Sequence, residues 1–215
     1  MGVNIKFIKL EEEISDENSV ENTKDGRLRR GNRSRELIAS AMVALVDEGN
    51  PKPNAKAISE RAGVSLRLVF HHFEDMESLY EAGAQLQVKR HWNQITRIST
   101  DLPLDNRINE FVAQRSTVYE GIGPVRRATA ALDLTSEFMS EMRVQVKFQL
   151  RKHAEETFKP ELSRAKNREQ ILDAIEILGS FEAWDVQRRF NTRSKEETSL
   201  LIENVLKLLL NCNLE

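Results

Sequence analysis

The chain has 215 residues, of which 31% are charged and 6% aromatic, and its net charge is only −2. This composition is typical of a helix-rich chain with one large domain, or with a small domain joined to a larger one. The near-neutral total excludes a generic polyanion binder. The single cysteine, Cys212, excludes an internal disulfide and a cysteine-based zinc site.

Charge is distributed unevenly along the chain. Residues 1–23 hold two basic and six acidic side chains, whereas residues 24–97 hold thirteen basic and nine acidic ones. Residues 1–25 show no sustained apolar period, so we expect a flexible acidic tail there. Residues 26–35, GRLRRGNRSR, are a basic run, which we interpret either as a solvated surface segment or as an arm that contacts phosphate.

Several classes of function lack sequence support. No apolar run is long enough for a signal peptide or a membrane span, so we expect a cytoplasmic protein with no membrane partner. No glycine-rich phosphate loop, Ser-His-Asp arrangement or carboxylate pair stands out, so we expect neither an enzyme nor a cofactor. His71 and His72 are adjacent and would point about 100° apart on a helix, which disfavours a metal site.

The first helix is expected over about residues 34–48, with Gly49 as its stop. Its inward face would carry Leu37, Ile38, Ala41, Met42 and Leu45. Pro51 and Pro53 predict a loop after it, because prolines two residues apart are incompatible with a helix.

Residues 57–73, AISERAGVSLRLVFHHF, have the pattern of a helix-turn-helix. We expect Asn54 to cap the second helix, Gly63 to form the turn and Ser65 to cap the third helix. Val69 and Phe73 would then pack inward. Asp75 would cap a long fourth helix with Leu79, Leu86, Ile95 and Ile98 on its inner face.

The rest of the chain also has helical periodicity. One helix would begin near Ile108 and end at Gly121–Pro124, a second would run from Phe138 to Pro160, and a third would span about residues 167–190. Ser194 and Glu197 predict a capping box for a final helix. That helix is apolar nearly all round, which predicts a second burial surface. We expect the two C-terminal helices to form a homodimer interface with those of a second copy.

The stretch IxxxAGVS at Ile58–Ser65, the cluster VFHHF at Val69–Phe73 and Leu79 resemble the tetracycline-repressor (TetR) family of bacterial transcription regulators. The resemblance covers about residues 34–80. It implies an all-α fold, with a three-helix DNA-binding domain that would take in residues 26–75 with the basic arm. Residues 76–215 would form an all-helical domain that dimerises and binds an effector.

The resemblance also implies which residues meet double-stranded DNA. Lys56 would touch a phosphate, and the start of the third helix would enter the major groove, where Arg67 could read guanine with its planar fork. The full set of expected DNA-binding residues is Arg29, Arg30, Arg33, Asn54, Lys56, Ser65, Leu66, Arg67, Leu68, Phe70, His71 and His72.

Three positions depart from the family pattern. Phe70 replaces a usual Tyr, Met76 a usual Lys and Ala55 a frequent Thr, and each change removes a polar contact to phosphate. We hypothesise that Arg27, Arg29, Arg30 and Arg33 replace these contacts. These departures also leave open an alternative, a helical sensor or assembly protein with weakened DNA binding.

The implied function is a repressor that leaves a palindromic operator when a small hydrophobic or aromatic ligand binds. The expected ligand residues are Phe111, Arg115, Tyr119, Met142 and Phe148, with Arg115 available for an acid group.

Overall fold

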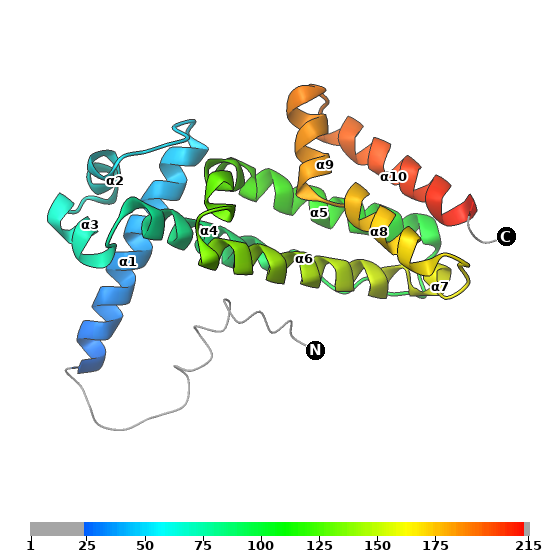
Figure 1. Cartoon of the computed structure of the whole chain (residues 1–215), viewed down its shortest axis with the longest axis horizontal. Coiled ribbons are helices and arrows are strands. Elements are labelled where there is room, and N and C mark those ends of the chain that lie inside the picture. The colour runs from blue at the N-terminus through cyan, green and yellow to red at the C-terminus, as the bar shows by residue number, and fades with distance from the viewer. Residues whose placement is uncertain (1–23, 213–215) are drawn as a thin grey trace. The chain divides into compact units, whose positions relative to one another are not determined.

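The computed structural model of the chain describes the backbone of residues 24–212 and the side chains of residues 31–211. The predicted acidic tail therefore lies almost entirely outside the described residues. Within them every regular element is a helix and no strand is present (Figure 1). The predicted all-α fold class is confirmed.

The helices follow one another along the chain with short connections. Their bounds are α1 (Lys24–Asp47), α2 (Ala55–Ala62), α3 (Leu66–His72), α4 (Met76–Trp92), α5 (Leu104–Ala128), α6 (Glu137–Thr157), α7 (Lys159–Leu162), α8 (Arg168–Leu178), α9 (Phe181–Asp185) and α10 (Lys195–Cys212). A 3-10 turn at Ala130–Asp133 follows α5, and a π-helical turn at Val186–Phe190 follows α9. No helix among the described residues combines the length and apolar character needed to cross a lipid bilayer.

The described residues form two compact units. The first contains residues up to Arg90 together with Pro124–Val144, and the second contains His91–Gly123 and the chain from Gln145 onward. The predicted boundary near residue 75 does not coincide with this division. The reason is that Leu79 and Leu86 of α4 lie in the core of the first unit, and Met142 of α6 joins them there.

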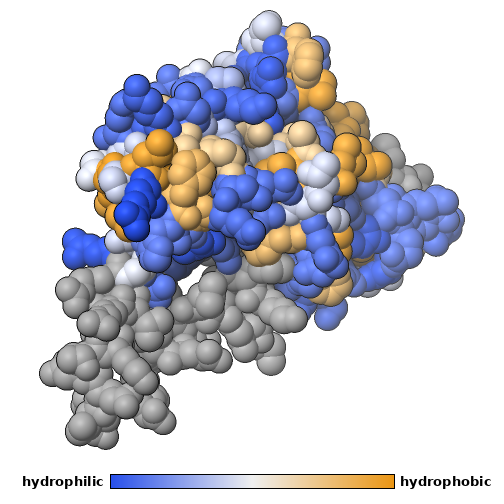
Figure 2. Space-filling model, turned by 60° about the vertical axis from the view of Figure 1, so that its left-hand side comes forward, coloured by the Kyte–Doolittle hydropathy of each residue, from blue (hydrophilic) through white to orange (hydrophobic). Residues whose placement is uncertain are grey.

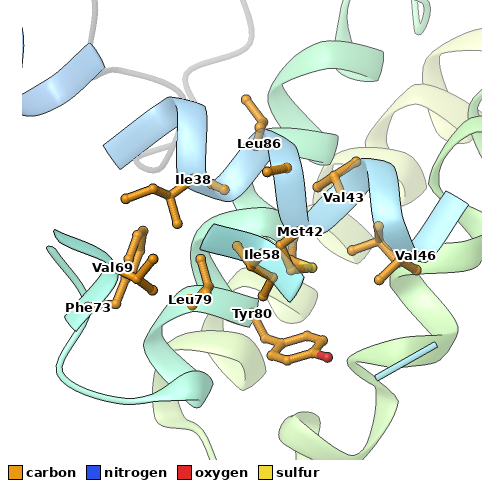
Figure 3. Packing of buried hydrophobic residues seen from close by; sticks show 14 of the residues in the cluster. Ile38, Met42, Val43, Val46, Ile58, Val69, Phe73, Leu79, Tyr80 and Leu86 are labelled. Carbon is orange, nitrogen blue, oxygen red and sulfur yellow. The ribbon is translucent and has the colours of Figure 1, made fainter. Parts of the chain in front are cut away.

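The core of the first unit joins α1, α2, α3 and α4. Figure 3 shows Val69 and Phe73 of α3 directed toward Ile38 of α1, and Ile58 of α2 beside Met42. All five side chains are at most 2% exposed. Burying one side chain of this kind contributes roughly 1.5–3 kcal/mol to the stability of the fold. These five side chains together therefore hold the short helices in place. The predicted inward position of Leu37 is wrong, because this side chain is 49% exposed.

The first helix begins ten residues earlier than predicted. Residues 26–35 are therefore the first turns of α1 and do not form a separate arm. Gly31 and Asn32 are weak helix formers, but the flanking arginines and leucines are good ones. Extending a helix that tertiary packing has already nucleated requires only one residue to be ordered for each hydrogen bond gained. The predicted stop at Gly49 is confirmed by its φ of 97°.

The fourth helix is shorter than predicted. It ends at Trp92, so Ile95 and Ile98 are not on its inner face. Ile98 is nevertheless buried, at 3% exposure, in the core of the second unit. The helical spacing of Ile98 is therefore a coincidence, because the chain has already left α4 when it buries this side chain.

Helix α5 continues through the predicted break. It passes Gly121, Gly123 and Pro124 and ends only at Ala128. Proline in a helix removes one hydrogen bond and normally kinks or ends the helix. Here Tyr119 is buried in the second unit and Val125 in the first, so tertiary packing holds the segment on both sides of Pro124. The division between the two units falls at this same place.

The helix predicted over residues 167–190 is instead interrupted. Helix α8 ends at Leu178, and Ser180 caps a new helix by accepting a hydrogen bond from the amide of Ala183 at 3.1 Å. Gly179 allows this joint to be compact, since a Cβ atom there would lie 3.1 Å from the ring of Phe111. Ser180 starts a new helix here, and the helix breaks even though the apolar spacing continues past Gly179.

The C-terminal helix follows its predicted capping box. The amide of Ser194 donates to the Glu197 carboxylate at 2.7 Å, and the amide of Glu197 donates to Ser194 Oγ at 3.0 Å. Helix α10 buries Leu206 and Leu210 in the second unit but leaves Leu208 65% exposed. Its apolar surface is therefore only partly used within the chain.

Candidate nucleic-acid interface

Local caps set the geometry of the helix-turn-helix. Gly63 takes the left-handed conformation, with φ of 65°, and its amide bonds back to the end of α2. Ser65 is extended, and its Oγ accepts a hydrogen bond from the amide of Leu68 at 3.2 Å. Glycine adopts this φ without the steric cost that other residues incur, and serine is among the preferred N-caps. The predicted turn and cap are confirmed.

Helix α3 has one buried and one exposed face. Val69 and Phe73 are 1% and 2% exposed, whereas Leu66 and Phe70 are 44% and 50% exposed. Residues four apart lie on the same side of a helix, so the exposed residues form one continuous surface. We call this surface the outward face of α3, and it consists of Leu66, Arg67, Phe70 and His71. Leu68 and His72, which were also predicted to meet DNA, lie at its edges, and both are half-buried.

Arg35 anchors the far end of α3 and was not predicted. Its Nη1 donates to the backbone carbonyl of His72 at 2.6 Å, and its guanidinium lies 4.2 Å from the ring centre of Phe73. The last carbonyls of a helix lack partners within the helix, so this contact from α1 satisfies one of them. The sequence offered little signal for it, because Arg35 is one of several arginines in a basic run.

The two predicted residues of α2 have different surroundings. Asn54 Oδ1 accepts a hydrogen bond from the amide of Ala57 at 2.9 Å, which confirms its cap. The ammonium of Lys56 lies 4.0 Å from the Glu60 carboxylate, and both side chains are at least two-thirds exposed. Such an exposed pair contributes little to stability, so Lys56 can exchange its partner easily.

The predicted basic residues of α1 are only partly described. Arg33 is exposed on α1. Arg29 and Arg30 belong to the same helix, but their side chains lie outside the described residues.

His71 and His72 are close enough to affect one another. Their rings are 5.3 Å apart in an edge-on arrangement. Burial lowers the pKa of His72, and the charges of His71 and Arg35 lower this pKa further. These effects disfavour the charged form of His72. Among the described residues, no group of three or more His, Cys, Asp or Glu side chains is placed to hold a metal ion.

The three departures from the family pattern differ in their positions. Ala55 is buried in the core of the first unit, and Met76 packs against that core. Phe70 alone lies on the outward face. Figure 2, turned so that the side with α2 and α3 comes forward, shows apolar patches among hydrophilic residues. Half-exposed apolar residues such as Phe70 and Leu66 are consistent with this mixed surface.

Three of the five predicted ligand residues lie together in the second unit. Phe111, Arg115 and Tyr119 are buried on α5, and both Arg115 and Tyr119 donate to the carbonyl of Gly179. The other two lie elsewhere: Met142 is in the core of the first unit, and Phe148 is 62% exposed on α6.

The sequence matches no protein-family model and no curated protein sequence. In structure, the chain is similar to a transcriptional regulator from Rhodococcus sp. Rha1, with a TM-score of 0.67 and 16% identity over 85% of this chain and 98% of that one. It is also similar to a protein from Rhodococcus sp. described as a TetR-family transcriptional regulator, with a TM-score of 0.62, 14% identity, and coverage of 83% and 99%. A third, with the same description and from Mesorhizobium loti MAFF303099, has a TM-score of 0.62, 16% identity, and coverage of 85% and 98%. The chain therefore has the fold of TetR-family regulators over most of its length.

Proposed function

We propose that this chain, which has the fold of TetR-family transcriptional regulators, binds double-stranded DNA as a homodimer and regulates transcription, most simply as a repressor. The observation that carries the proposal is the outward face of α3. A short helix whose buried side is locked by Val69 and Phe73 presents Arg67 to solvent at its N-terminal end. This is the presentation by which a recognition helix reaches base edges in the major groove.

Electrostatics supports the same interpretation. Residues 24–97 carry a net charge of +4, whereas residues 1–23 and 98–215 are acidic overall. Phosphate contacts require such local basic excess. Lys56 and Arg33 are exposed, and the Glu60 carboxylate near Lys56 is itself exposed.

The C-terminal helices support dimerisation. Large apolar side chains stand exposed on α8, on the π-helical turn and on α10: Ile177, Val186, Phe190, Leu200 and Leu208 are 45–74% exposed. A second copy would cover them by pairing its own α8 and α10 against these helices. Two α3 helices would then meet half-sites about one DNA turn apart, which implies a roughly palindromic operator.

An effector would act by favouring one of two conformations. A small hydrophobic or aromatic ligand bound near Phe111 and Tyr119 would release DNA only if it binds more tightly to the conformation that fits DNA poorly. Regulation of this kind implies a cytoplasmic protein and requires no catalytic activity.

Selection of bound fragments from genomic DNA tests the proposed function. We expect fragments with an inverted repeat, bound at least about a thousandfold more tightly than random DNA at matched salt. Failure to enrich any sequence, with binding equally weak on all fragments, would overturn it.

One observation favours a second candidate function. Two of the four residues on the outward face of α3, Leu66 and Phe70, are apolar. A helical sensor or assembly protein would use this face to bind a protein, and it would show no salt-dependent affinity for any DNA.

A further inference from the structure

Two buried arginines on α5 differ in how their charges are balanced. Arg107 forms a two-pronged ion pair with Glu161, with N–O distances of 2.7 and 2.5 Å, and its Nε donates to the carbonyl of Leu102 at 3.0 Å. Arg115 is similarly buried, at 5% exposure. In the part of the chain that the structure describes, no carboxylate lies within ion-pair distance of Arg115, and its Nε has no hydrogen-bond acceptor.

Neutral groups only partly solvate Arg115. Its Nη1 donates to the Tyr119 hydroxyl at 3.2 Å and to the Gly179 carbonyl at 3.1 Å, and its Nη2 donates to the Leu150 carbonyl at 2.8 Å. The guanidinium also lies 4.5 Å from the ring centre of Phe111. A buried cation is normally paired with an anion, so this arrangement leaves a charge to be neutralised.

A second unsatisfied atom belongs to His153 on α6. Its Nε2 lies 2.9 Å from the carbonyl of Thr96, so Nε2 carries the proton, and Nδ1 is left as a buried acceptor without a donor. His153 and Arg115 both lie against Phe111, since the rings of His153 and Phe111 stack with centres 5.7 Å apart. The unit thus holds one free donor and one free acceptor beside the same aromatic ring.

Further aromatic side chains pack against Phe111 and Tyr119. Phe158 lies 5.2 Å from Phe111, while Phe181 and Trp184 lie 5.8 and 6.5 Å from Tyr119, all measured between ring centres. A planar aromatic body suits contacts of this kind, since aromatic rings gain energy from offset and edge-on packing.

We propose that Arg115 and His153 anchor an aromatic carboxylate that also carries a hydrogen-bond donor, such as a hydroxyl group. The carboxylate accepts from Arg115 Nε and balances its charge, and the donor bonds to His153 Nδ1. The proposed ligand site rests on the proposed function in one respect only, namely that the bound ligand acts as an effector of DNA binding. Because both atoms are buried, binding must part the side chains that cover them, and the affinity includes the free energy of that opening.

The same anchor offers a route for a signal within the second unit. Arg115 and Tyr119 both hold the carbonyl of Gly179, which lies at the joint between α8 and α9. A carboxylate competes with this carbonyl and with that of Leu150 for the guanidinium. Ligand binding would therefore loosen the joint that precedes α9.

The test compares 3-hydroxybenzoate and benzoate with their neutral amides, by calorimetry and thermal shift on the full chain, because a hydroxyl at position 3 cannot bond to the ligand's own carboxylate. We expect the wild-type chain to bind each carboxylate at least about tenfold more tightly than its amide, as a charge-assisted bond implies. Arg115→Gln should abolish that preference, and His153→Phe should abolish the advantage of 3-hydroxybenzoate over benzoate. The control is the double variant Arg107→Gln with Glu161→Gln, which neutralises the neighbouring buried pair and should keep both preferences.

Two outcomes would overturn the proposal. One is a wild-type chain that binds no carboxylate of the series better than its amide, as expected if Arg115 only ties α5 to neighbouring carbonyls or if a water joins the two atoms. The other is a carboxylate preference that survives Arg115→Gln. If Arg115→Gln does not fold, NMR of the wild-type chain decides, because bound carboxylate must shift the Nε–H resonance of Arg115. DNA binding is measured separately, so the ligand-binding result can be interpreted even if the chain binds no DNA.

Discussion

The exposure and the contacts of individual residues in this protein depend on the side of the helix that they occupy. Val69 and Phe70 are neighbours in sequence, yet the first is 1% and the second 50% exposed. Arg35 stabilises the C-terminal end of α3 although it lies on α1. Function at this scale follows from burial and from the partner atoms, and two predictions concern single side chains.

Arg67 on the outward face of α3 should read a base. Replacement by Ala should weaken binding to the selected operator by about 1–3 kcal/mol and binding to random DNA much less, because the variant cannot make a forked pair of hydrogen bonds to guanine. The matched variant is Lys56→Ala, which should weaken both by a similar amount. Competition titrations at fixed salt measure the difference, and equal effects of Arg67→Ala on both DNAs would make Arg67 a phosphate contact.

His153 should make the fold sensitive to acid. Burial, followed by the charge of Arg115, lowers its pKa to about 4 from an ordinary value of 6.5. Because the folded state binds this proton less readily than the unfolded state, the stability from His153 is complete above pH 6.5 and is lost as pH falls toward 4. The loss should reach about 3 kcal/mol by pH 4. Urea unfolding from pH 7 to 4 should show a flatter decline for His153→Gln, and parallel curves would contradict the assignment.

At the scale of helices, local caps decide where several helices begin, and packing carries one helix past its predicted end. Asn54, Ser65 and Ser194 each start a helix through a side-chain bond to a nearby amide. Helix α5, in contrast, continues through Pro124 because both sides of it are buried in cores. Two predictions concern helices as units.

Gly83 allows α4 to approach α1 closely. A Cβ atom there would lie only 1.8 Å from the terminal methyl group of Met42, which is fully buried. Gly83→Ala should therefore destabilise the chain by about 1–3 kcal/mol, through crowding of the core. Gly31→Ala is the control, since that helical glycine has nothing within 4 Å and should stabilise α1 by about 0.5–1 kcal/mol. Chemical denaturation of both variants checks the opposite signs.

The N-terminal turns of α1 should bind phosphates of the DNA backbone. Replacing Arg29, Arg30 and Arg33 together by Gln should make the slope of log K against log salt shallower by about 0.9 for each phosphate that is no longer neutralised. Substitution is a better test than deletion, because these residues belong to α1 and truncation would shorten the helix. An unchanged slope would show that the basic run is only a solvated surface.

At the scale of the whole molecule, each unit has its own core, and α4, α5 and α6 each have residues in both units. Exposed apolar residues remain on α8 and α10 after each core is complete. An incomplete apolar surface of this kind accounts for the proposed homodimer.

The dimer should depend on α10. Leu208→Glu should raise the dissociation constant by at least about a hundredfold, because it places a charge in a buried apolar interface. Val144→Glu is the control, since Val144 on α6 is exposed to nearly the same extent, 64% against 65%. Sedimentation over a range of concentrations measures both, and a monomeric wild-type chain or an equal effect of the two variants would refute this interface.

Local chemistry was sufficient to predict much of the helix-turn-helix. Gly63, Ser65 and the capping box of Ser194 depend on backbone geometry within four residues, so the sequence already contains the needed information. Residue spacing likewise assigned Val69 and Phe73 to the core. The resemblance to TetR regulators rested on these same positions.

Other features required the folded chain. The continuation of α5 through Pro124 and the contact of Arg35 with α3 depend on neighbours far away in sequence. So does the contrast between Arg107, which finds Glu161 fifty-four residues away, and Arg115, which has no carboxylate partner among the described residues. The surroundings of a buried charge are formed by side chains from other segments of the chain. The periodicity of one helix therefore cannot predict which side chains those are.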